Sequence, residues 1–420
     1  MSRGDSESPF ERLLLRKIEQ SVAQAPIRVT LGEKPPGEAG DGSLDRVVIR
    51  DGRTLARMML DPEVGFGDAY TEGRIRVEGD LVRFLEEAYR IRQSGRMRSW
   101  YSELISRWLT LTQGNTHRGS ARNIQHHYDL NNDFYKLWLD RRMVYTCAYF
   151  PALSATLEEA QEAKLEHVCR KLQLQPGEKV VEAGCGWGSL ALYMAKHYGV
   201  TVQAFNISRE QIQYARAQAK KEGLTGQVEF IEDDYRNIPE GFDAFVSVGM
   251  LEHVGHEHYG ELAQVIQNAI GDSGRGLLHF IGRNRPQAFS SWIRKRIFPG
   301  AYAPTLRESL EILERNNYAV LDVENLRLHY AKTLEHWLER YERAVDRVTE
   351  MFGPEFVRAW RLYLAGSIAS FRVGTLQLFQ VVFAGPQCGQ IPWTRAHLYE
   401  GEAGYAGEAR LEKEWTPARY

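Results

Sequence analysis

The sequence predicts an α/β protein with a parallel, Rossmann-like central sheet and a smaller N-terminal α+β domain. Short apolar strands alternate with helical segments between residues 179 and 248, which is the pattern of a parallel sheet. A glycine-rich turn, residues 182–188, directly follows the first of these strands. The chain has 420 residues, more than one ordinary domain, so two domains with sizeable cores are expected.

The smaller domain is predicted over residues 1–118. The polar segment 32–42 is interpreted as a turn between two of its strands, and the stretch 112–120, poor in large apolar residues, marks the boundary. The second domain then spans residues 119–420. No apolar run follows Met1 and no stretch of about 18 apolar residues occurs, so neither export nor membrane spanning is predicted and a cytoplasmic protein is expected.

Charge and cysteine content indicate whether the protein binds nucleic acid or zinc. The 53 Lys and Arg residues nearly balance the 55 Asp and Glu residues, which gives no polycation for nucleic acid. Four cysteines, Cys147, Cys169, Cys185 and Cys388, lack paired metal spacing, so we expect no zinc site and a reducing compartment.

The glycine-rich turn is the first sign of a ligand site. It follows the apolar strand 179–181 and precedes the helical segment 190–195, and glycines there permit positive φ angles and close approach of a ligand. Taken alone, the turn also fits a dinucleotide site or a purely structural bend.

The ends of the next strands favour one cofactor. Strand 200–205 ends at Asn206, where a dinucleotide enzyme usually carries an acid, and strand 228–231 ends in an acidic and aromatic run that includes Asp234 and Tyr235. That run suits the edge and face of an adenine better than a phosphate. S-adenosylmethionine fits best, because it has no phosphate and its sulfonium is attracted to acidic and aromatic groups.

Several separated segments then resemble one family. The segments are residues 127–130, 145–150, 160–165, 182–188, 247–255 and 277–282. In order and spacing they resemble the cyclopropane fatty acid synthase family of methyltransferases, over about Asn123 to Phe383. Residues 65–73 resemble the extra N-terminal domain of the phospholipid-acting bacterial members. The resemblance implies a class I methyltransferase fold with helical insertions that form an acyl site.

The resemblance also implies site residues. The implied cofactor residues are Tyr145, Thr146, Glu182, Gly184, Gly186, Asn206, Gln211, Asp234 and Tyr235. The implied catalytic residues, which hold a bound bicarbonate in the family, are Cys147, Glu252, His279, Tyr330 and the backbone amide of Ile281. Family members usually carry threonine at Asn206, aspartate at Glu182 and glycine at Asn131.

Each catalytic candidate also has a structural interpretation when it is read without the family. Cys147, among apolar and aromatic neighbours, fits a buried core position, and Glu252 lies in a predicted loop at a strand end, where it could cap. His279 lies in an apolar strand, where a histidine is usually a satisfied core residue. Tyr330 has almost no local signal.

The substrate side is expected in the segment after the fifth strand. Basic residues alternate there with apolar ones: Arg283, Arg285, Trp292, Ile293, Arg294, Lys295, Arg296, Ile297 and Phe298. A second pattern of this kind is Arg90, Arg92, Arg96, Arg98, Trp100, Tyr101, Ile105 and Trp108. Both suit a phospholipid surface, although the first also fits an amphipathic helix packed through its aromatic stripe. Helices over 334–345 and 356–371 would line an acyl tunnel or form an ordinary core, and the tail 384–420 would cover the catalytic domain or assist assembly.

The sequence therefore predicts an enzyme that transfers a methylene group from S-adenosylmethionine to the cis double bond of an acyl chain in membrane phospholipid. We expect a homodimer, bound peripherally to the inner face of the membrane, with the N-terminal domain engaging lipid as in the resembled branch. The alternatives are a lipid C-methyltransferase that leaves a methyl or methylene branch, a small-molecule N-methyltransferase, and a lipid-binding regulatory protein without catalysis.

Overall fold

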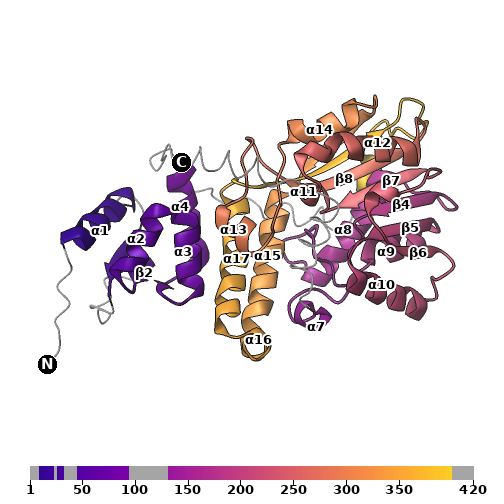
Figure 1. Ribbon diagram of the computed structural model, residues 1–420. Coiled ribbons are helices and arrows are strands. Elements are labelled where there is room, and N and C mark those ends of the chain that lie inside the picture. The colour runs from indigo at the N-terminus through magenta and orange to yellow at the C-terminus, as the bar shows by residue number, and fades with distance from the viewer. Residues whose placement is uncertain (1–8, 23–25, 33–44, 94–130, 400–420) are drawn as a thin grey trace.

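The computed structural model describes residues 9–22, 26–32, 45–93 and 131–399 of the chain. Two sheets organise these residues, a three-stranded sheet in the N-terminal part and a seven-stranded sheet at the opposite end of the molecule (Figure 1). Helices cover the larger sheet on both faces. The predicted α/β class is therefore confirmed.

The N-terminal part combines the small sheet with helices. Its strands are β1 (Ile27–Leu31), β2 (Asp45–Ile49) and β3 (Ile75–Glu78), and its described helices are α1 (Pro9–Val22), α2 (Gly52–Leu60), α3 (Pro62–Thr71) and α4 (Leu81–Gln93). Asp51 and Asp61 cap α2 and α3 through their side chains. The predicted turn 32–42 lies almost wholly outside the described residues, but β1 and β2, on either side of it, pair in parallel, so no simple hairpin joins them.

The large sheet has the strand order β6-β5-β4-β7-β8-β10-β9. The strands are β4 (Lys179–Ala183), β5 (Thr201–Asn206), β6 (Val228–Glu232), β7 (Ala244–Val248), β8 (Arg275–Gly282), β9 (Ala319–Asn325) and β10 (Gln377–Ala384). The strands from β6 to β8 in this order pair in parallel, as predicted, whereas β10 runs antiparallel to both β8 and β9. A strand from the far end of the chain thus lies inside the sheet.

Two sets of helices bury the faces of this sheet. They are α8 (Leu157–Leu172), α9 (Ser189–Tyr198) and α10 (Arg209–Glu222) on one face, and α12 (Tyr259–Ile270) and α14 (Leu306–Glu314) on the other. The apolar side chains of β4, β5 and β7 point alternately into the two clusters, since successive residues of a strand face opposite sides. The β10 strand is buried along its whole length and β8 at every residue except the partly buried Ile281, and both strands continue the two clusters.

The helices outside the sheet form a separate layer. They are α7 (Asn132–Tyr135), α13 (Ser291–Arg296), α15 (Arg327–Arg343), α16 (Val345–Phe352) and α17 (Pro354–Arg372). The helices predicted over 334–345 and 356–371 are confirmed as α15 and α17, but α15 begins earlier and contains Tyr330. One hydrophobic cluster runs from the N-terminal sheet through α17 and α15 to α7.

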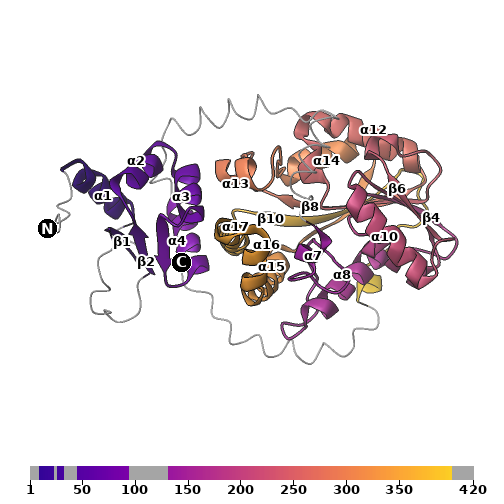
Figure 2. The ribbon, with the colours of Figure 1, turned by 60° about the horizontal axis from the view of Figure 1, so that its bottom comes forward.

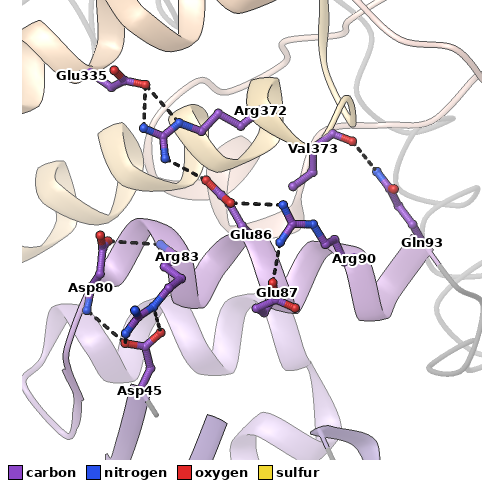
Figure 3. A network of polar contacts seen from close by, with 10 residues as sticks. All are labelled: Asp45, Asp80, Arg83, Glu86, Glu87, Arg90, Gln93, Glu335, Arg372 and Val373. Carbon is purple, nitrogen blue, oxygen red and sulfur yellow. Dashed lines mark hydrogen bonds and ion pairs between the residues drawn. The ribbon is translucent and has the colours of Figure 1, made fainter. Parts of the chain in front are cut away.

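The N-terminal part packs on α17 and α13 through α3 and α4 (Figure 2). At the edge of this contact, Arg372 donates to Glu86 of α4 at 2.9 Å and to Glu335 of α15 at 2.8 Å, and Gln93 reaches the Val373 carbonyl (Figure 3). These side chains are partly exposed, so their ion pairs stabilise the contact only weakly. The shared apolar cluster holds the two parts together.

Parts of the predictions cannot be compared with this fold. The boundary at 112–120, the segment 127–130 and residues 400–420 of the tail lie outside the described residues. The described end of the tail packs on α8 beside the large sheet, since the Leu398 side chain is buried and its carbonyl accepts from Arg170 of α8 at 3.2 Å. None of the helices in the described ranges is long and apolar enough to cross a membrane.

Candidate active site

A cavity lies at the carboxyl ends of the parallel strands. Parallel sheets place their ligands at this edge, beside the point where the strand order reverses. The residues predicted to hold the cofactor all line the cavity: Tyr145, Thr146, Glu182, Gly184, Gly186, Asn206, Gln211, Asp234 and Tyr235. A cavity lined by all of these residues is the candidate site for a nucleoside cofactor.

The glycine-rich turn takes a conformation that other residues rarely adopt. Gly184, Gly186 and Gly188 have φ angles of 82°, 54° and 84°. A Cβ on Gly188 would lie 2.5 Å from the Phe230 ring, so this glycine allows the turn to pack closely on β6. A Cβ on Gly186 would meet no protein atom within 4 Å. Because Gly186 lines the cavity, we interpret that open space as the place of the ligand.

An amide pair follows at the end of β5. The Asn206 side chain donates to Gln211 Oε1 at 2.7 Å and to the Gly186 carbonyl at 3.3 Å. Ser208 caps α10 and accepts from the Gln211 backbone, which holds Gln211 in the first turn of this helix. The pair therefore presents neutral donors and acceptors, the groups that recognise ribose hydroxyls.

The acidic and aromatic run lies beyond β6. Asp234 caps a short 3₁₀ helix and accepts from Arg236, whose guanidinium carbon lies 4.9 Å from the centre of the Tyr235 ring. The Tyr235 hydroxyl is buried without a hydrogen-bond partner, and burial raises the pKa of this phenol. Arg236 thus covers part of the Tyr235 ring and also donates to the Asp234 carboxylate. Neither contact is predicted from the sequence.

Lys164 is a cavity residue that sequence reasoning missed. Its ammonium is buried in α8 and donates to Thr146 Oγ1 at 3.1 Å. Burial lowers the pKa of Lys164 to about 8, although nearby Glu182 and Asp140 oppose this shift. Lys164 lies in a run of inward-facing positions with Ala160, Gln161 and Leu165. A charged residue on the buried face of an amphipathic helix was the available signal.

Glu182 faces the same part of the cavity. Its carboxyl group is buried, and one oxygen, Oε2, has no hydrogen-bond partner. Burial raises the pKa of Glu182 to about 7, and Lys164 partly counteracts that rise. The cavity therefore has a buried acid and a buried ammonium close to Thr146.

The predicted bicarbonate ligands form a second cluster, outside the lining of the cavity. Leu326 connects two of these residues. Its carbonyl oxygen accepts from the Tyr330 backbone N–H at 3.1 Å and lies 3.9 Å from the Cys147 sulfur. The Leu326 backbone N–H also donates to Leu378 on β10, which pairs with Ile281 on β8. Segments far apart in the sequence thus meet beside β8.

Glu252 enters this cluster from a short helix, α11 (Leu251–Val254), so the predicted loop is wrong at this position. Gly249, with a φ of 76°, turns the chain after β7 and the helix begins at once. The Glu252 Oε1 atom accepts from the Ile281 backbone N–H at 2.6 Å, and Oε2 is buried without a partner. Burial raises the pKa of Glu252 to about 7, against the effect of the Ile281 hydrogen bond.

His279 lies on the same face of β8 as Ile281. Its Nδ1 is 3.0 Å from the amide nitrogen of Gln380 on β10, and its Nε2 has no hydrogen-bond partner in the part of the chain that the structure describes. With Gln380 as donor, the proton of the neutral imidazole is on Nε2. Burial lowers the pKa of His279 well below its usual range, so the ring is neutral. Sequence reasoning missed Gln380, because nothing local shows that β10 inserts beside β8.

Cys147 and Tyr330 complete the cluster. The Cys147 thiol donates to the Ala148 carbonyl at 3.1 Å, and burial raises its pKa, which keeps it protonated. Tyr330, in the first turns of α15, packs on Phe371 with ring centres 4.7 Å apart. A protonated thiol acts here as a weak donor and not as a nucleophile.

The cavity and the cluster are adjacent. Tyr145 and Thr146 line the cavity, whereas the next residue, Cys147, belongs to the cluster. In the same way Glu252 belongs to the cluster and the next residue, His253, lines the cavity. Each of these two segments therefore contributes one residue to the cluster directly beside residues that line the cavity.

The predicted basic surface after β8 is only partly exposed. Arg283, Trp292, Arg294 and Ile297 are buried, while Lys295 and Arg296 are exposed and lie beside Asp61 and Asp68 of the N-terminal part. The helix packs through its aromatic side, because Trp292 fills the space above Gly67. The interpretation of this whole segment as a membrane-facing surface is therefore wrong, and the packed-helix alternative holds for α13.

Most of the second predicted basic patch, residues 90–108, lies outside the residues that the structure describes. Arg90 and Arg92 are described and pair with Glu86, Glu87 and Glu63. Arg96, Arg98, Trp100, Tyr101, Ile105 and Trp108 lie outside the described residues. In the described part of the chain, no group of His, Cys, Asp and Glu side chains could hold a metal ion.

Comparison with known proteins gives the same family as the sequence resemblance. The model of the family described as mycolic acid cyclopropane synthetase matches residues 115–381. A probable fatty acid methyltransferase of Pseudomonas putida is 34% identical over 392 residues, which cover 89% of this chain and 96% of that protein. The cyclopropane-fatty-acyl-phospholipid synthase of Escherichia coli K12 is 40% identical over 259 residues, 61% of this chain and 66% of that protein.

Solved structures agree with the fold. The mycolic acid cyclopropane synthase CmaA1, complexed with SAH and CTAB, has a TM-score of 0.60 and 30% identity, and the match covers 64% of this chain and 99% of that chain. The cyclopropane synthase MmaA2 from Mycobacterium tuberculosis also has a TM-score of 0.60, with 28% identity over 63% of this chain and 98% of that one.

Proposed function

Because the chain belongs to the mycolic acid cyclopropane synthetase family of S-adenosylmethionine-dependent enzymes that act on lipids, we propose that it transfers a methylene group to the cis double bond of a phospholipid acyl chain. The product is a cyclopropane fatty acid. The methyl group leaves the sulfonium and forms a bond to one alkene carbon, and loss of a proton from that new methyl group closes the ring.

One observation carries this proposal: the cofactor cavity adjoins a cluster of buried polar atoms that lack partners. Glu252 Oε2 and His279 Nε2 are both buried and have no hydrogen-bond partner among the described residues. Glu252 is bonded to the Ile281 backbone N–H, and His279 lies two residues before Ile281 on β8. Methyl transfer to a hydroxyl or an ammonium group also releases a proton, so a base alone does not distinguish the reactions. A carbocation additionally requires that the base be held where water is excluded, and the burial of this cluster supports that requirement.

The cavity residues have distinct roles in binding the cofactor. We assign the adenine to Asp234 and Tyr235, the ribose to Asn206 and Gln211, and the amino-acid portion to the region of Tyr145, Thr146, Gly184 and Gly186. Lys164 has donors to spare beyond its bond to Thr146, so its ammonium is suited to the cofactor carboxylate. Bound S-adenosylmethionine supplies an electrophilic methyl group, and Tyr145 places aromatic surface beside its positive charge.

The second cluster fits a small planar anion such as bicarbonate. Glu252 Oε2 is an unsatisfied acceptor for a hydroxyl proton, and His279 Nε2–H is an unsatisfied donor for an oxygen. Cys147, from the segment before α8, and Tyr330, from α15, complete the proposed set. The predicted role of the Ile281 amide as a direct ligand is not supported, because its N–H already donates to Glu252 Oε1 at 2.6 Å and so positions Glu252 instead. When bound there, bicarbonate supplies a base that a carbocation does not readily alkylate. The protein residues hold that base and exclude water.

The remaining parts have supporting roles. The helices α15 and α17 hold an aromatic cluster beside Tyr145, with the Tyr145 and Tyr363 hydroxyls 2.9 Å apart, and we assign the acyl chain to this side. Residues 1–118 are proposed as a domain for lipid engagement and homodimer formation, and residues 119–420 as the catalytic domain. The enzyme would then work at the cytoplasmic membrane face without crossing it.

The test uses purified protein, isotopically labelled S-adenosylmethionine and vesicles of a phospholipid with cis-monounsaturated chains. Mass spectrometry and proton NMR of the released acyl groups identify the product. A gain of one CH₂ with upfield ring protons supports the proposal, whereas absence of label in any lipid would overturn it. The Glu252→Gln variant, prepared identically, controls for contaminating activity.

The names of several relatives support a second candidate product, a branched fatty acid. Relatives matched over nearly their whole length are named fatty acid methyltransferases, among them the Pseudomonas putida protein and a tuberculostearic acid methyltransferase of Mycobacterium tuberculosis that is 28% identical. The same carbocation gives a methyl or methylene branch if a hydride shifts or another proton is lost. In the NMR spectrum a methyl doublet or exocyclic alkene protons would identify that outcome.

A further inference from the structure

Two arginines in the segment after β8 are buried, and no carboxylate in the described residues forms an ion pair with either guanidinium. The Arg283 guanidinium lies over the Phe289 ring, with its carbon 5.2 Å from the ring centre, so this contact is aromatic and not ionic. Arg283 and Arg294 are only 8% and 6% exposed. The Nε atom of each is buried and lacks a hydrogen-bond acceptor among the residues that the structure describes. A buried guanidinium normally pairs with a carboxylate, because an unpaired buried charge costs several kcal/mol. Neither arginine therefore has the environment of a purely structural residue.

The nearest acid is already engaged. Glu63 of α3 is the acidic residue that acts on both guanidiniums. Its carboxylate accepts from Arg92 of α4 and from the Ser291 backbone N–H, the latter at 2.6 Å. Three arginines thus share one carboxylate, which leaves an excess of positive charge. Burial, and next the charge of Arg92, lower the pKa of Arg283 to about 10, so it remains protonated near neutral pH.

The other cations of α13 differ from these two. Arg296 forms a two-bond ion pair with Asp68, at 2.8 and 3.0 Å, and Lys295 lies 3.9 Å from Asp61. Both side chains are well exposed. The exposed cations of this short helix therefore have acidic partners in the N-terminal part, whereas the buried Arg294 does not.

The position of the buried pair connects it to the proposed active site. Arg283 directly follows β8 and lies two residues after Ile281, about 7 Å along an extended strand. The segment that follows returns to the site, since the Tyr302 backbone N–H donates to the Glu252 carbonyl at 2.8 Å. Arg294 lies on α13, which faces α3 across the contact between the N-terminal and catalytic parts (Figure 2).

We propose that Arg283 and Arg294 bind the phosphate of the substrate headgroup, an inference that rests on the proposed function. A phosphodiester oxygen supplies the acceptor that each Nε lacks, and guanidinium groups match phosphate in geometry and charge. The phosphate would be held in the contact between the two parts of the protein while the acyl chain extends towards Glu252 and His279. The N-terminal part contributes through Arg92 and Glu63, which border the same site.

The test compares two substrates that differ only in the headgroup. One is a phospholipid with cis-monounsaturated chains, and the other is the diacylglycerol with the same chains, both in neutral detergent micelles that remove surface electrostatics. We expect the wild-type kcat/KM to be at least tenfold higher for the phospholipid. Arg283→Met and Arg294→Met should each lower kcat/KM for the phospholipid by tenfold or more and leave the value for diacylglycerol nearly unchanged.

Arg285→Met is the matched control, because Arg285 is exposed and only two residues from Arg283. It should leave the ratio of the two kcat/KM values as in the wild type. If Arg285→Met lowers the ratio as much as Arg283→Met, general attraction to anions explains the preference and the inference is overturned. If the wild type uses both lipids equally, the phosphate site is wrong while the proposed function stands. If it uses neither lipid, the proposed function itself fails.

A stability measurement separates binding from a structural role. Without lipid, Arg283→Met should raise Tm, because methionine removes an unpaired buried charge at similar volume. Inorganic phosphate at constant ionic strength should raise Tm of the wild type and not of the variant. If Arg283→Met lowers Tm and reduces kcat/KM equally for the phospholipid and the diacylglycerol, Arg283 has a structural role. Stabilisation by inorganic phosphate without lipid discrimination would make the site one for free phosphate, and either result overturns the headgroup assignment.

Discussion

Glu252 Oε1 accepts the backbone N–H of Ile281 at 2.6 Å, while its second oxygen is buried and unpaired. The hydrogen bond fixes the carboxylate, and the free oxygen is the one available for chemistry. Glu252→Gln keeps an acceptor for Ile281 but replaces the free oxygen by a donor, so the fold should persist. We expect turnover to fall by about a hundredfold or more, the magnitude typical of loss of an acid–base group.

The measurement pairs single-turnover rates with calorimetric binding of S-adenosylmethionine. The Kd should change by less than about threefold, since Glu252 does not line the cofactor cavity. A variant that loses cofactor binding, or one that retains full turnover, would show that Glu252 does not have the assigned role.

The raised pKa of Glu252 predicts a pH dependence of stability. The folded protein holds this proton up to about pH 7, whereas the unfolded chain releases it near 4.5. The folded state therefore binds more protons between these values, and its stability falls as pH rises through them. Glu252→Gln removes this loss. The difference in free energy of unfolding, variant minus wild type, should therefore be up to about 3 kcal/mol larger at pH 8 than at pH 4.

Thermal or urea unfolding of the two proteins across this pH range checks the sign. Glu182, which has a similar pKa, remains in both proteins and cancels in the difference. A difference between variant and wild type that stays constant with pH would mean that Glu252 titrates normally.

The open space at Gly186 predicts a selective loss of cofactor binding. Gly186 and Gly223 both have positive φ angles, 54° and 74°, and a Cβ on either would meet no protein atom within 4 Å. Alanine at each position should therefore cost a similar 1 to 2 kcal/mol, roughly, in backbone strain. Only Gly186 lines the cavity, so Gly186→Ala should weaken S-adenosylmethionine binding by about tenfold or more while Gly223→Ala does not. Equal losses would attribute the effect to stability.

Lys164 is expected to bind the cofactor carboxylate. Lys164→Met should raise the Kd for S-adenosylmethionine by about tenfold to a hundredfold, the usual contribution of a charged hydrogen bond. The Kd for the decarboxylated analogue should stay nearly unchanged. Lys171→Met is the matched control, because Lys171 is also buried on α8 but already pairs with Glu324 at 2.6 Å. Calorimetry with both ligands decides the matter. If Lys164→Met weakened the two ligands alike, Lys164 would act on the shape of the cavity alone.

The sequence predicted the cavity better than the second cluster, for a physical reason. The strands before Gly184 and Asn206 are apolar, short and bounded by turn residues, so local patterns show where each ends. Parallel strands then bring these ends to one edge. No such rule brings Cys147 to Leu326 or Gln380 to His279, because those contacts depend on tertiary packing.

The errors have similar causes. A single helical turn is too short to give a periodic pattern, so the sequence predicts a loop at Glu252, where the structure has α11. The charge of Arg294 predicts a surface position, but α3 packs on α13 and Arg294 is buried. The position of Lys164 on the inward face of α8 is a signal that is present in the sequence. Charge alone does not distinguish a solvated residue from a buried one.

The position of β10 between β8 and β9 sets an order in which a newly made chain can become active. A chain that leaves the ribosome N-terminus first presents the glycine-rich turn and β4 to β7 early. Until residues 377–384 emerge, β8 has an open edge and His279 lacks Gln380. Under the proposed function, the cluster assigned to proton removal therefore cannot be complete before residues 377–384 have left the ribosome, so the last strand made is the one that finishes the site.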